Sequence, residues 1–315
     1  MVNKNSKIFV AGHKGMIGSA ILKKLNEKGY KKIFHVESKK LDLRDQNKVF
    51  AYLKKIKPDG IIIAAAKVGG ISANNTYKAD FIYDNLAIQN NIIHGAYINK
   101  VRNLIFLGSS CVYPRNSKQP IKEEYLLSDY LEKTNEPYAI AKIAGIKMCS
   151  SYNFQYNLNY KCLMPCNSYG ISDNYNLQTS HFLPALINKI IFAIKNKDDH
   201  IKIWGSGKPL RELIFSEDIA DACIYFLNKK IKHSLINIGT GEDKSINHYA
   251  KFIMNHLGVN LKIINQKNKL EGTYKKLLDV SLAKKYGWIY KTSLEKGISI
   301  TINDYLENNL LKKDK

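Results

Sequence analysis

The first half of the chain alternates short apolar runs with longer segments in which apolar positions recur every three or four residues. The apolar runs predict buried strands near residues 7–12, 31–36, 60–66, 103–110 and 159–165. The segments between them predict helices at about 16–28, 48–55, 81–97 and 137–153. Strands that are apolar throughout and alternate with helices are typical of a parallel sheet covered on both faces. The pattern therefore predicts a doubly wound α/β fold.

This rhythm changes near residue 169. Beyond that point the loops lengthen, and short apolar stretches at 201–207, 235–241 and 260–265 are interleaved with helical patterns. We expect a first domain over residues 1–168 and a smaller α/β lobe over residues 169–315. The boundary is soft, because we expect some later elements to return to the main sheet.

The composition adds a strong positive charge. The chain has 49 Lys and Arg against 27 Asp and Glu, a net charge of +22, and such an excess occurs in proteins that bind nucleic acid or membrane surfaces. However, only Arg44, Arg102, Arg115 and Arg211 are arginines, and the lysines are spread along the whole chain. Arginine is preferred for bidentate recognition of phosphates and bases. The distribution favours a general enrichment in lysine, and we expect no nucleic-acid partner.

Other features of the sequence bear on where the protein is located. It has no run of about 18 apolar residues that could span a membrane, and its first residues lack the pattern of a secretory signal. Five cysteines are an odd number, and no two are spaced as in a CxxC pair. We therefore expect no membrane partner, no metal site and a location in the reducing cytoplasm.

A glycine-rich turn follows the first predicted strand and opens the first predicted helix. Small residues at this place let the backbone approach a pyrophosphate, whose charge then lies at the helix N-terminus. A tight turn that needs glycine only for its geometry is the alternative. We predict a Rossmann-type dinucleotide site. Its residues are Gly12, His13, Lys14, Gly15, Met16, Ile17 and Gly18.

The choice of cofactor depends on the end of the second predicted strand. An acidic residue there holds the ribose hydroxyls of NAD, whereas positive charge accommodates the 2′-phosphate of NADP. Glu37 favours NAD. Ser38, Lys39 and Lys14 favour NADP(H), which is the cofactor we predict.

Tyr138 and Lys142 form a YxxxK pair on a predicted helix that Pro137 opens. Residues four apart share one helical face, and an ammonium beside a phenol lowers the phenol pKa. Tyr138 is therefore a candidate acid for a carbonyl that is being reduced. Ser109 follows the fourth predicted strand, at the edge of the sheet where ligands bind, and can hydrogen-bond the same carbonyl oxygen.

Cys111 lies two residues beyond Ser109. A strand-end cysteine is often a small buried apolar residue. A thiolate is also a competent base for a proton next to a ketone, provided that nearby cations lower its pKa. Epimerisation would need an acid on the opposite face, and His181 is the candidate.

The chain resembles, nearly end to end, the GDP-L-fucose synthase family of the extended short-chain dehydrogenase/reductase superfamily. The resemblance is carried by the segments 11–20, 64–85, 107–114, 134–147, 204–215 and 237–241. The family converts GDP-4-keto-6-deoxy-D-mannose to GDP-L-fucose with NADPH, inverting C3 and C5 and reducing C4. The resemblance implies a homodimer formed through the helices near 81–98 and 137–153. It also implies these roles: Tyr138 as proton donor at C4, Lys142 as its electrostatic partner, Ser109 as ligand of the C4 oxygen, Cys111 as base and His181 as acid.

The resemblance implies further contacts. Asp42 lies in a segment similar to an adenine contact of the superfamily, and a turn or a helix cap is nearly as good an explanation. Substrate contacts would come from Lys189, Trp204, Arg211 and Glu271; a core position for Trp204 and a surface ion pair for Arg211 are the alternatives. The further cofactor contacts would be Asp42, Leu43, Leu107, Gly108, Ser109, Ser110, Lys142, Pro165, Cys166, Asn167, Ser168 and His181.

The sequence also departs from the family pattern. Cys166 adds a thiol near the expected nicotinamide site, residues 171–175 lack a usual proline, and residues 270–276 lack a proline and an arginine. Cys111 and Val112 stand where a 4,6-dehydratase would need an Asp-Glu pair. The alternatives are the same chemistry on another GDP-4-keto-deoxy sugar, and a non-catalytic protein that senses nucleotides or binds nucleic acid.

Overall fold

The computed structural model describes residues 2–177, 179–268 and 272–310. Its main sheet has six parallel strands in the order β2-β1-β3-β4-β5-β9. The strands are β1 (Lys7–Ala11), β2 (Lys32–Phe34), β3 (Gly60–Ile63), β4 (Asn103–Leu107), β5 (Asn159–Pro165) and β9 (Leu235–Ile238). Strands β1, β3, β4 and β5 are buried along nearly their whole length, which explains their continuous apolar character.

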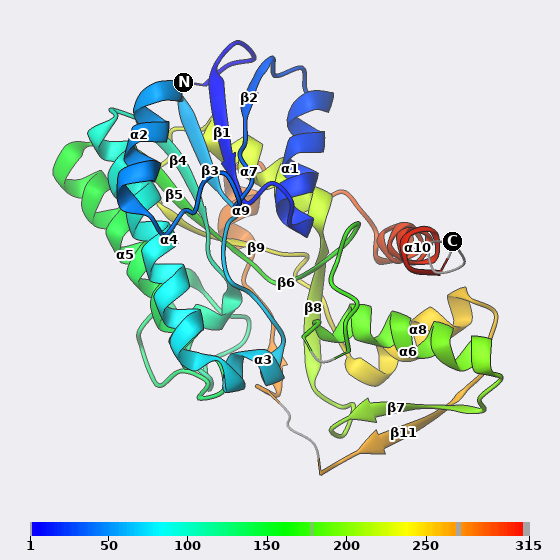
Figure 1. Cartoon of the computed structure of the whole chain (residues 1–315). Helices are drawn as coiled ribbons and strands as arrows, with labels where there is room; N and C mark the ends of the chain where they lie inside the picture. The colour runs from blue at the N-terminus through cyan, green and yellow to red at the C-terminus, as the bar shows by residue number, and fades with distance from the viewer. Residues whose placement is uncertain (1, 178, 269–271, 311–315) are drawn as a thin grey trace.

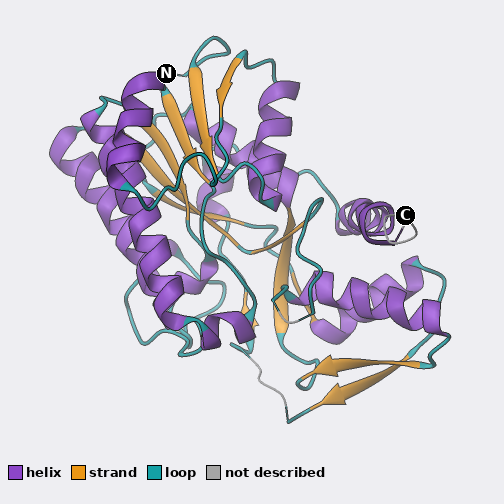
Figure 2. Cartoon of the chain, viewed as in Figure 1, coloured by secondary structure: helices purple, strands orange, loops and turns teal. Residues whose placement is uncertain are grey.

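Helices cover both faces of this sheet (Figures 1 and 2). One layer holds α1 (Met16–Glu27) packed against α7 (Ser216–Leu227). The other holds α2 (Gln46–Ile56), α4 (Lys78–Ile98) and α5 (Glu136–Tyr156), with α4 against α5. The short α9 (Ser281–Lys285) contacts β9. The doubly wound α/β fold is confirmed.

A second lobe lies beside the carboxyl ends of the main strands (Figure 1). It contains the strands β6 (Asn167–Tyr169), β8 (Leu210–Phe215), β10 (Asp243–Ser245) and β12 (Lys275–Lys276), which pair around β8. A two-stranded sheet joins β7 (His200–Trp204) and β11 (Lys262–Gln266). The helices of this lobe are α6 (Phe182–Asn196), α8 (Ile246–His256) and α10 (Leu294–Tyr305). Its apolar core is separate from that of the main sheet.

Several predicted boundaries differ from the structure. The second strand spans only β2, because β1 pairs with it over just three residues. The third strand stops at Ile63, where β1 also ends at Ala11. The fourth ends at Leu107, because the Ser109 side chain accepts a hydrogen bond from Cys111 and caps a 3₁₀ turn over Ser110–Val112. The short helix α3 (Ile71–Thr76) was not predicted.

Among the described residues, no helix combines the length and apolar character needed to cross a membrane.

Candidate active site

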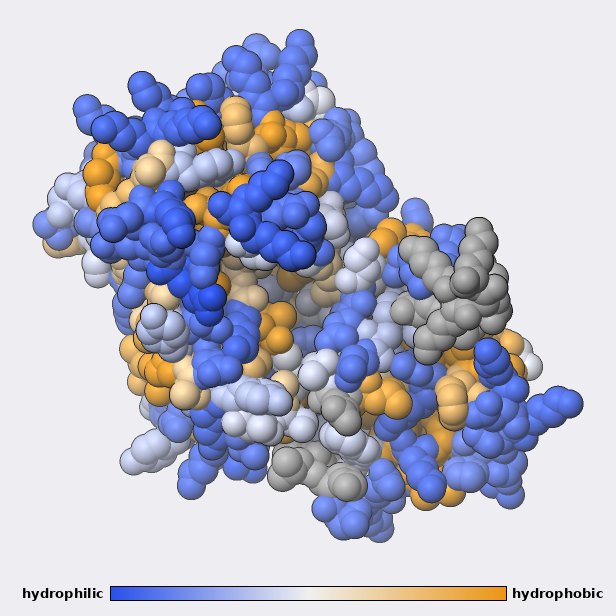
Figure 3. Space-filling model, in the orientation of Figure 1, coloured by the Kyte–Doolittle hydropathy of each residue, from blue (hydrophilic) through white to orange (hydrophobic). Residues whose placement is uncertain are grey.

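A deep cleft of about 1080 Å³ runs between the two lobes, at the carboxyl ends of the parallel strands. Figure 3 shows this hollow on the molecular surface. The cleft is lined by every predicted site residue that the structure describes. Glu271 lies outside the described residues. Segments that are far apart in the sequence therefore meet at one place.

The glycine turn is shaped so that only hydrogen fits at two of its positions. Gly12 has a φ of +86°, and a Cβ there would lie 2.5 Å from the backbone nitrogen of Ala65. A Cβ on Gly18 would lie 2.0 Å from the carbonyl oxygen of Gly12. This close approach brings the start of α1 against β1 and leaves the turn open to the cleft. The turn therefore fits the pyrophosphate of a dinucleotide.

Lys14, which favours NADP, and Glu37, which favours NAD, are in direct contact just beyond β2. Lys14 Nζ lies 2.9 Å from Glu37 Oε1, and both side chains are largely exposed. The Lys14 hydrogen bond and charge lower the pKa of Glu37. Ser38 and Lys39 are exposed beside the pair. The positive charge near a 2′-phosphate therefore depends on whether Lys14 contacts the phosphate or stays paired with Glu37.

Charged side chains continue along this end of the cleft. Asp42 accepts hydrogen bonds from the backbone and side chain of Arg44 and also lines the cleft. Arg44 also reaches Asp84 on α4, at 2.9 Å. Asp84 in turn pairs with Lys67, at 3.2 Å. This network ties the loop after β2 to the loop after β3.

The predicted acid and its partners lie at the centre of the cleft. Tyr138 and Lys142 lie one turn apart on α5, and both are nearly fully buried. Lys142 Nζ donates to the carbonyl of Leu107 at 2.8 Å, which anchors α5 to the end of β4. Ser109 lies beside Tyr138 and lowers the pKa of its phenol.

The pKa of Tyr138 corrects one expectation. We predicted that the Lys142 ammonium lowers it, but burial raises the pKa of Tyr138 well above its ordinary value, and Ser109 offsets only part of this rise. Burial also lowers the pKa of Lys142 to about 7, and its nitrogen lies 5.9 Å from the Tyr138 ring centre. With a pKa near 7, Lys142 is only partly protonated at neutral pH. Its positive charge therefore does not offset the desolvation of the Tyr138 phenolate.

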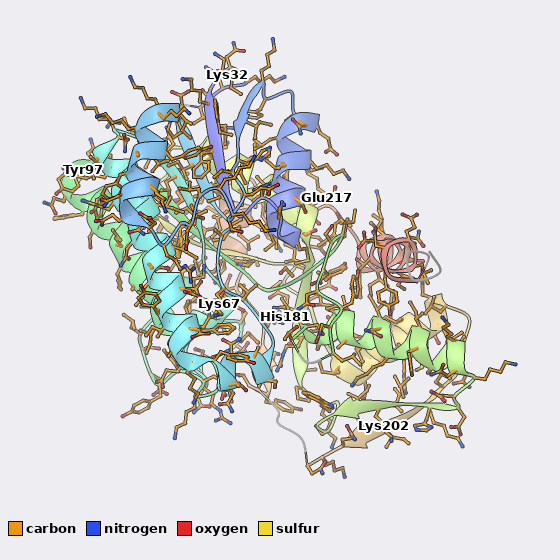
Figure 4. All side chains as sticks on the ribbon, viewed as in Figure 1. Lys32, Lys67, Tyr97, His181, Lys202 and Glu217 are labelled. Atoms are coloured by element: carbon orange, nitrogen blue, oxygen red, sulfur yellow. The ribbon has the colours of Figure 1, made fainter. Side chains whose placement is uncertain are left out.

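Cys111 lies beside this group and has two side-chain donors. Asn135 Nδ2 lies 3.3 Å from its sulfur and Lys276 Nζ lies 3.5 Å from it. His181 directly precedes α6 and lines the cleft between the two lobes (Figure 4). Partial desolvation at the cleft and the charge of Lys276 lower the pKa of His181. A thiol with a cationic neighbour and an imidazole are thus available in one cleft.

The predicted substrate residues lie on the second lobe. Lys189 on α6 places its nitrogen 5.6 Å from the ring centre of Trp204, which is 47% exposed, so Trp204 is no core residue. The Lys189 ammonium also donates to the carbonyl of Lys202 at 2.8 Å. Arg211 on β8 donates to the carbonyl of Leu210 at 2.7 Å. The side chains of Lys189, Trp204 and Arg211 all line the cleft.

Two functional candidates were missed from the sequence. Asn135 lies in the segment 134–147 that carried the resemblance, so the motif could have indicated it. Lys276 lies in the segment 270–276, which was noted only for what it lacks. Cys166, the added thiol, lies at the cleft wall, where burial raises the pKa of its sulfhydryl.

A parallel sheet with a glycine turn after its first strand, together with Ser109, Tyr138 and Lys142 at one edge, defines a nicotinamide-dinucleotide enzyme of the short-chain dehydrogenase/reductase class. Residues 8–239 match the NAD dependent epimerase/dehydratase family. The chain belongs to this family.

Within this family, the chain is similar over nearly its whole length to several individual proteins. The chain is 46% identical over 308 residues to GDP-L-fucose synthase 1 of Arabidopsis thaliana, covering 98% of this chain and 95% of the relative. A solved GDP-6-OMe-4-keto-L-xylo-heptose reductase from C. jejuni superimposes with a TM-score of 0.90 at 34% identity, covering 98% and 99% of the two chains. A GDP-L-fucose synthetase from Naegleria fowleri bound to NADP gives 0.88 at 28% identity, covering 98% and 96%.

Proposed function

We propose that this enzyme converts GDP-4-keto-6-deoxy-D-mannose into GDP-L-fucose, by epimerisation at C3 and C5 and NADPH-dependent reduction at C4. One observation carries the proposal: a carbonyl-reducing group and a thiol–imidazole pair open onto the same cleft. The 46% identity to a GDP-L-fucose synthase over nearly the whole chain supports it. Inversion and reduction of one sugar ring need both sets of groups.

The reduction half uses the buried centre of the cleft. NADPH, when bound, supplies the hydride that C4 receives. Tyr138 donates a proton to the C4 oxygen, and Ser109 hydrogen-bonds the same oxygen. The raised pKa keeps Tyr138 protonated at neutral pH, so it is ready to act as an acid. Lys142 holds the end of β4 against α5 through Leu107.

The epimerisation half uses Cys111 and His181. C3 and C5 both flank the C4 ketone, so a proton at either carbon is acidic, and one site that stabilises the enolate oxygen serves both. The Cys111 thiolate takes the proton from the ring carbon, and the C–H electron pair moves towards the C4 oxygen. His181 then delivers a proton to the opposite face. The lowered pKa of His181 makes its protonated form a stronger acid, but it also leaves less of that form at neutral pH.

The cofactor residues fit NADP(H). The glycine turn would hold the pyrophosphate, and Lys14, Ser38 and Lys39 would meet the 2′-phosphate. Glu37 opposes this choice, but it already pairs with Lys14. The GDP-L-fucose synthetase from Naegleria fowleri was solved with NADP bound, which supports the same assignment here.

The second lobe would hold the GDP moiety. Arg211 can bind the diphosphate, because its guanidinium matches phosphate geometry. Trp204 offers an exposed indole face for the guanine or the sugar. Lys189, beside Trp204, adds positive charge. Glu271, which lies outside the described residues, is proposed as a further substrate contact.

The chain organisation proposed from the sequence follows the same division. Residues 1–168 would form most of the cofactor domain and residues 169–315 most of the substrate lobe. The two separate apolar cores support this division. Helix α7 and strand β9 join the main sheet from beyond residue 169, so the substrate part is discontinuous.

We further propose a cytoplasmic homodimer, with no nucleic-acid or membrane partner. Helices α4 and α5 carry exposed apolar side chains that a second copy could cover, among them Tyr83, Ile98, Ile140 and Phe154. Sedimentation velocity across a range of concentrations tests this assembly. A monomer at every concentration would contradict it.

The decisive experiment is to incubate the protein with GDP-4-keto-6-deoxy-D-mannose and NADPH and to identify the product by NMR. GDP-L-fucose is the expected product. A C4-reduced sugar that retains its original C3 and C5 configuration would exclude the epimerase half. Absence of turnover, with turnover of another GDP-4-keto sugar, would favour the alternative substrate class; the C. jejuni relative is named as a reductase of such a sugar, a GDP-linked 4-keto-heptose.

A further inference from the structure

Lys276 reaches the sulfur of Cys111 from the other lobe. The two residues are 165 positions apart in the sequence, and their side-chain atoms Nζ and Sγ lie 3.5 Å apart. Lys276 belongs to β12 and is half-buried at the cleft wall. Cys111 belongs to the turn after β4, on the cofactor side. The contact therefore joins the two walls of the cleft.

The backbone around Lys276 is held on both sides. Lys276 pairs in register with Arg211 on β8. The next residue, Leu277, donates to the Gln119 side chain at 2.9 Å, and its carbonyl accepts from Ile121 at 2.7 Å. A strand fixed on two sides places its side chains reproducibly. The Lys276 ammonium is therefore directed at Cys111 by the strand.

The adjacent lysine provides a natural contrast. Side chains of successive strand residues point to opposite faces. Lys275 accordingly points away, and its nitrogen lies 3.7 Å from the Asp243 carboxylate. Lys275 is not part of the described cleft lining. Two equal charges one residue apart thus have different surroundings.

Three other neighbours of Cys111 among the described residues are uncharged in the neutral range. Asn135, at the start of α5, donates an amide hydrogen bond to the sulfur. Tyr138 on α5 interacts with Cys111, and its raised pKa keeps the phenol neutral. Ser109 accepts a hydrogen bond from the Cys111 backbone. Of these neighbours, Lys276 supplies the positive charge that a thiolate needs.

We propose that Lys276 is a positioning residue that holds Cys111 as a thiolate, and so prepares the base for epimerisation. This rests on the proposed function, in which Cys111 takes the proton from C3 or C5. In that step the ring C–H bond breaks, an S–H bond forms, and the electron pair moves to the C4 oxygen. Lys276 keeps its own protons throughout.

The state of the thiol can be measured without any sugar. The full-length protein is treated with iodoacetamide between pH 5 and pH 10, and alkylation of the Cys111 peptide is followed by mass spectrometry. The wild type should show an apparent Cys111 pKa below the ordinary thiol value of about 8.5. Lys276→Met should raise that pKa by about one unit and slow alkylation at pH 7 about tenfold.

The control variants separate charge from structure. Lys275→Met removes a charge of the same sign one residue away and should leave the profile unchanged, whereas Lys276→Arg should retain most of the lowered pKa. A wild-type profile in Lys276→Met, or equal shifts in both methionine variants, would overturn the proposal. If Lys276→Met fails to fold, a wild-type Cys111 pKa at or above about 8.5 would overturn it by itself.

A second readout links the thiol to the reaction. Exchange of the C3 and C5 protons with deuterium oxide should fall in Lys276→Met at pH 7 and recover as the pH rises. A lowered thiol pKa without any proton exchange in the wild type would refute the proposed function and leave the role of Lys276 intact. Exchange in the wild type with an unshifted thiol would refute the role of Lys276 alone.

Discussion

Replacing Gly18 by alanine adds a methyl group where the first turn of the cofactor loop already lies. The new Cβ would stand 2.0 Å from the Gly12 carbonyl oxygen and 2.9 Å from the His13 Cα. Both neighbours are backbone atoms, so the clash cannot be relieved by moving a flexible side chain. The helix α1 or the strand–turn junction has to shift instead.

The magnitude follows from two opposing effects. Overpacking of this kind costs about 3 kcal/mol, and alanine in place of glycine inside a helix gains about 1 kcal/mol. The net loss for Gly18→Ala is therefore about 2 kcal/mol. For a chain of this size that corresponds to a fall in Tm of about 3 °C.

Gly15→Ala is the matched control in the same loop. A Cβ at Gly15 would lie 3.6 Å from the Gly12 carbonyl, which is an ordinary contact. Its Tm should stay near that of the wild type, while its NADPH affinity should fall, because Gly15 lines the cleft that the pyrophosphate would occupy. Thermal unfolding and NADPH fluorescence titration measure the two effects. A Gly18→Ala protein as stable as Gly15→Ala would refute the reasoning.

Three further predictions concern the chemistry. Tyr138→Phe should abolish NADPH oxidation with the keto sugar while retaining NADPH binding; unchanged oxidation would remove Tyr138 from its role as acid. Cys111→Ser and His181→Gln should each lose exchange of the C3 and C5 protons in deuterium oxide, and exchange at the wild-type rate in both variants would show that the base and acid lie elsewhere. Glu37→Gln should lower the KM for NADPH several-fold relative to NADH, because it removes a negative charge and releases Lys14 from its 2.9 Å contact. An unchanged ratio of the two KM values would show that the pair does not decide cofactor choice.

Local sequence patterns were sufficient to predict the main elements of the fold, the glycine turn and the Tyr138–Lys142 pair. Apart from helix α3, the order of strands and helices up to residue 165 follows from the alternation of apolar runs and helical patterns, because a parallel sheet buries both faces of its strands. The YxxxK pair needs only the helix period to bring Tyr138 and Lys142 together. The glycine turn is likewise local, since it joins one strand to the next helix. The boundaries were less exact, because strand ends depend on where the partner strand ends.

Tertiary structure decided the features that depend on distant partners. The sixth strand of the main sheet is β9, from beyond residue 169. Burial reverses the expected direction of the Tyr138 pKa shift, since desolvation depends on the packed surroundings. Lys14 and Glu37, which favoured different cofactors as separate residues, are partners in space. Cys111 and Lys276 come together across 165 residues, because the fold closes two lobes around one cleft, and no spacing along the chain encodes that closure.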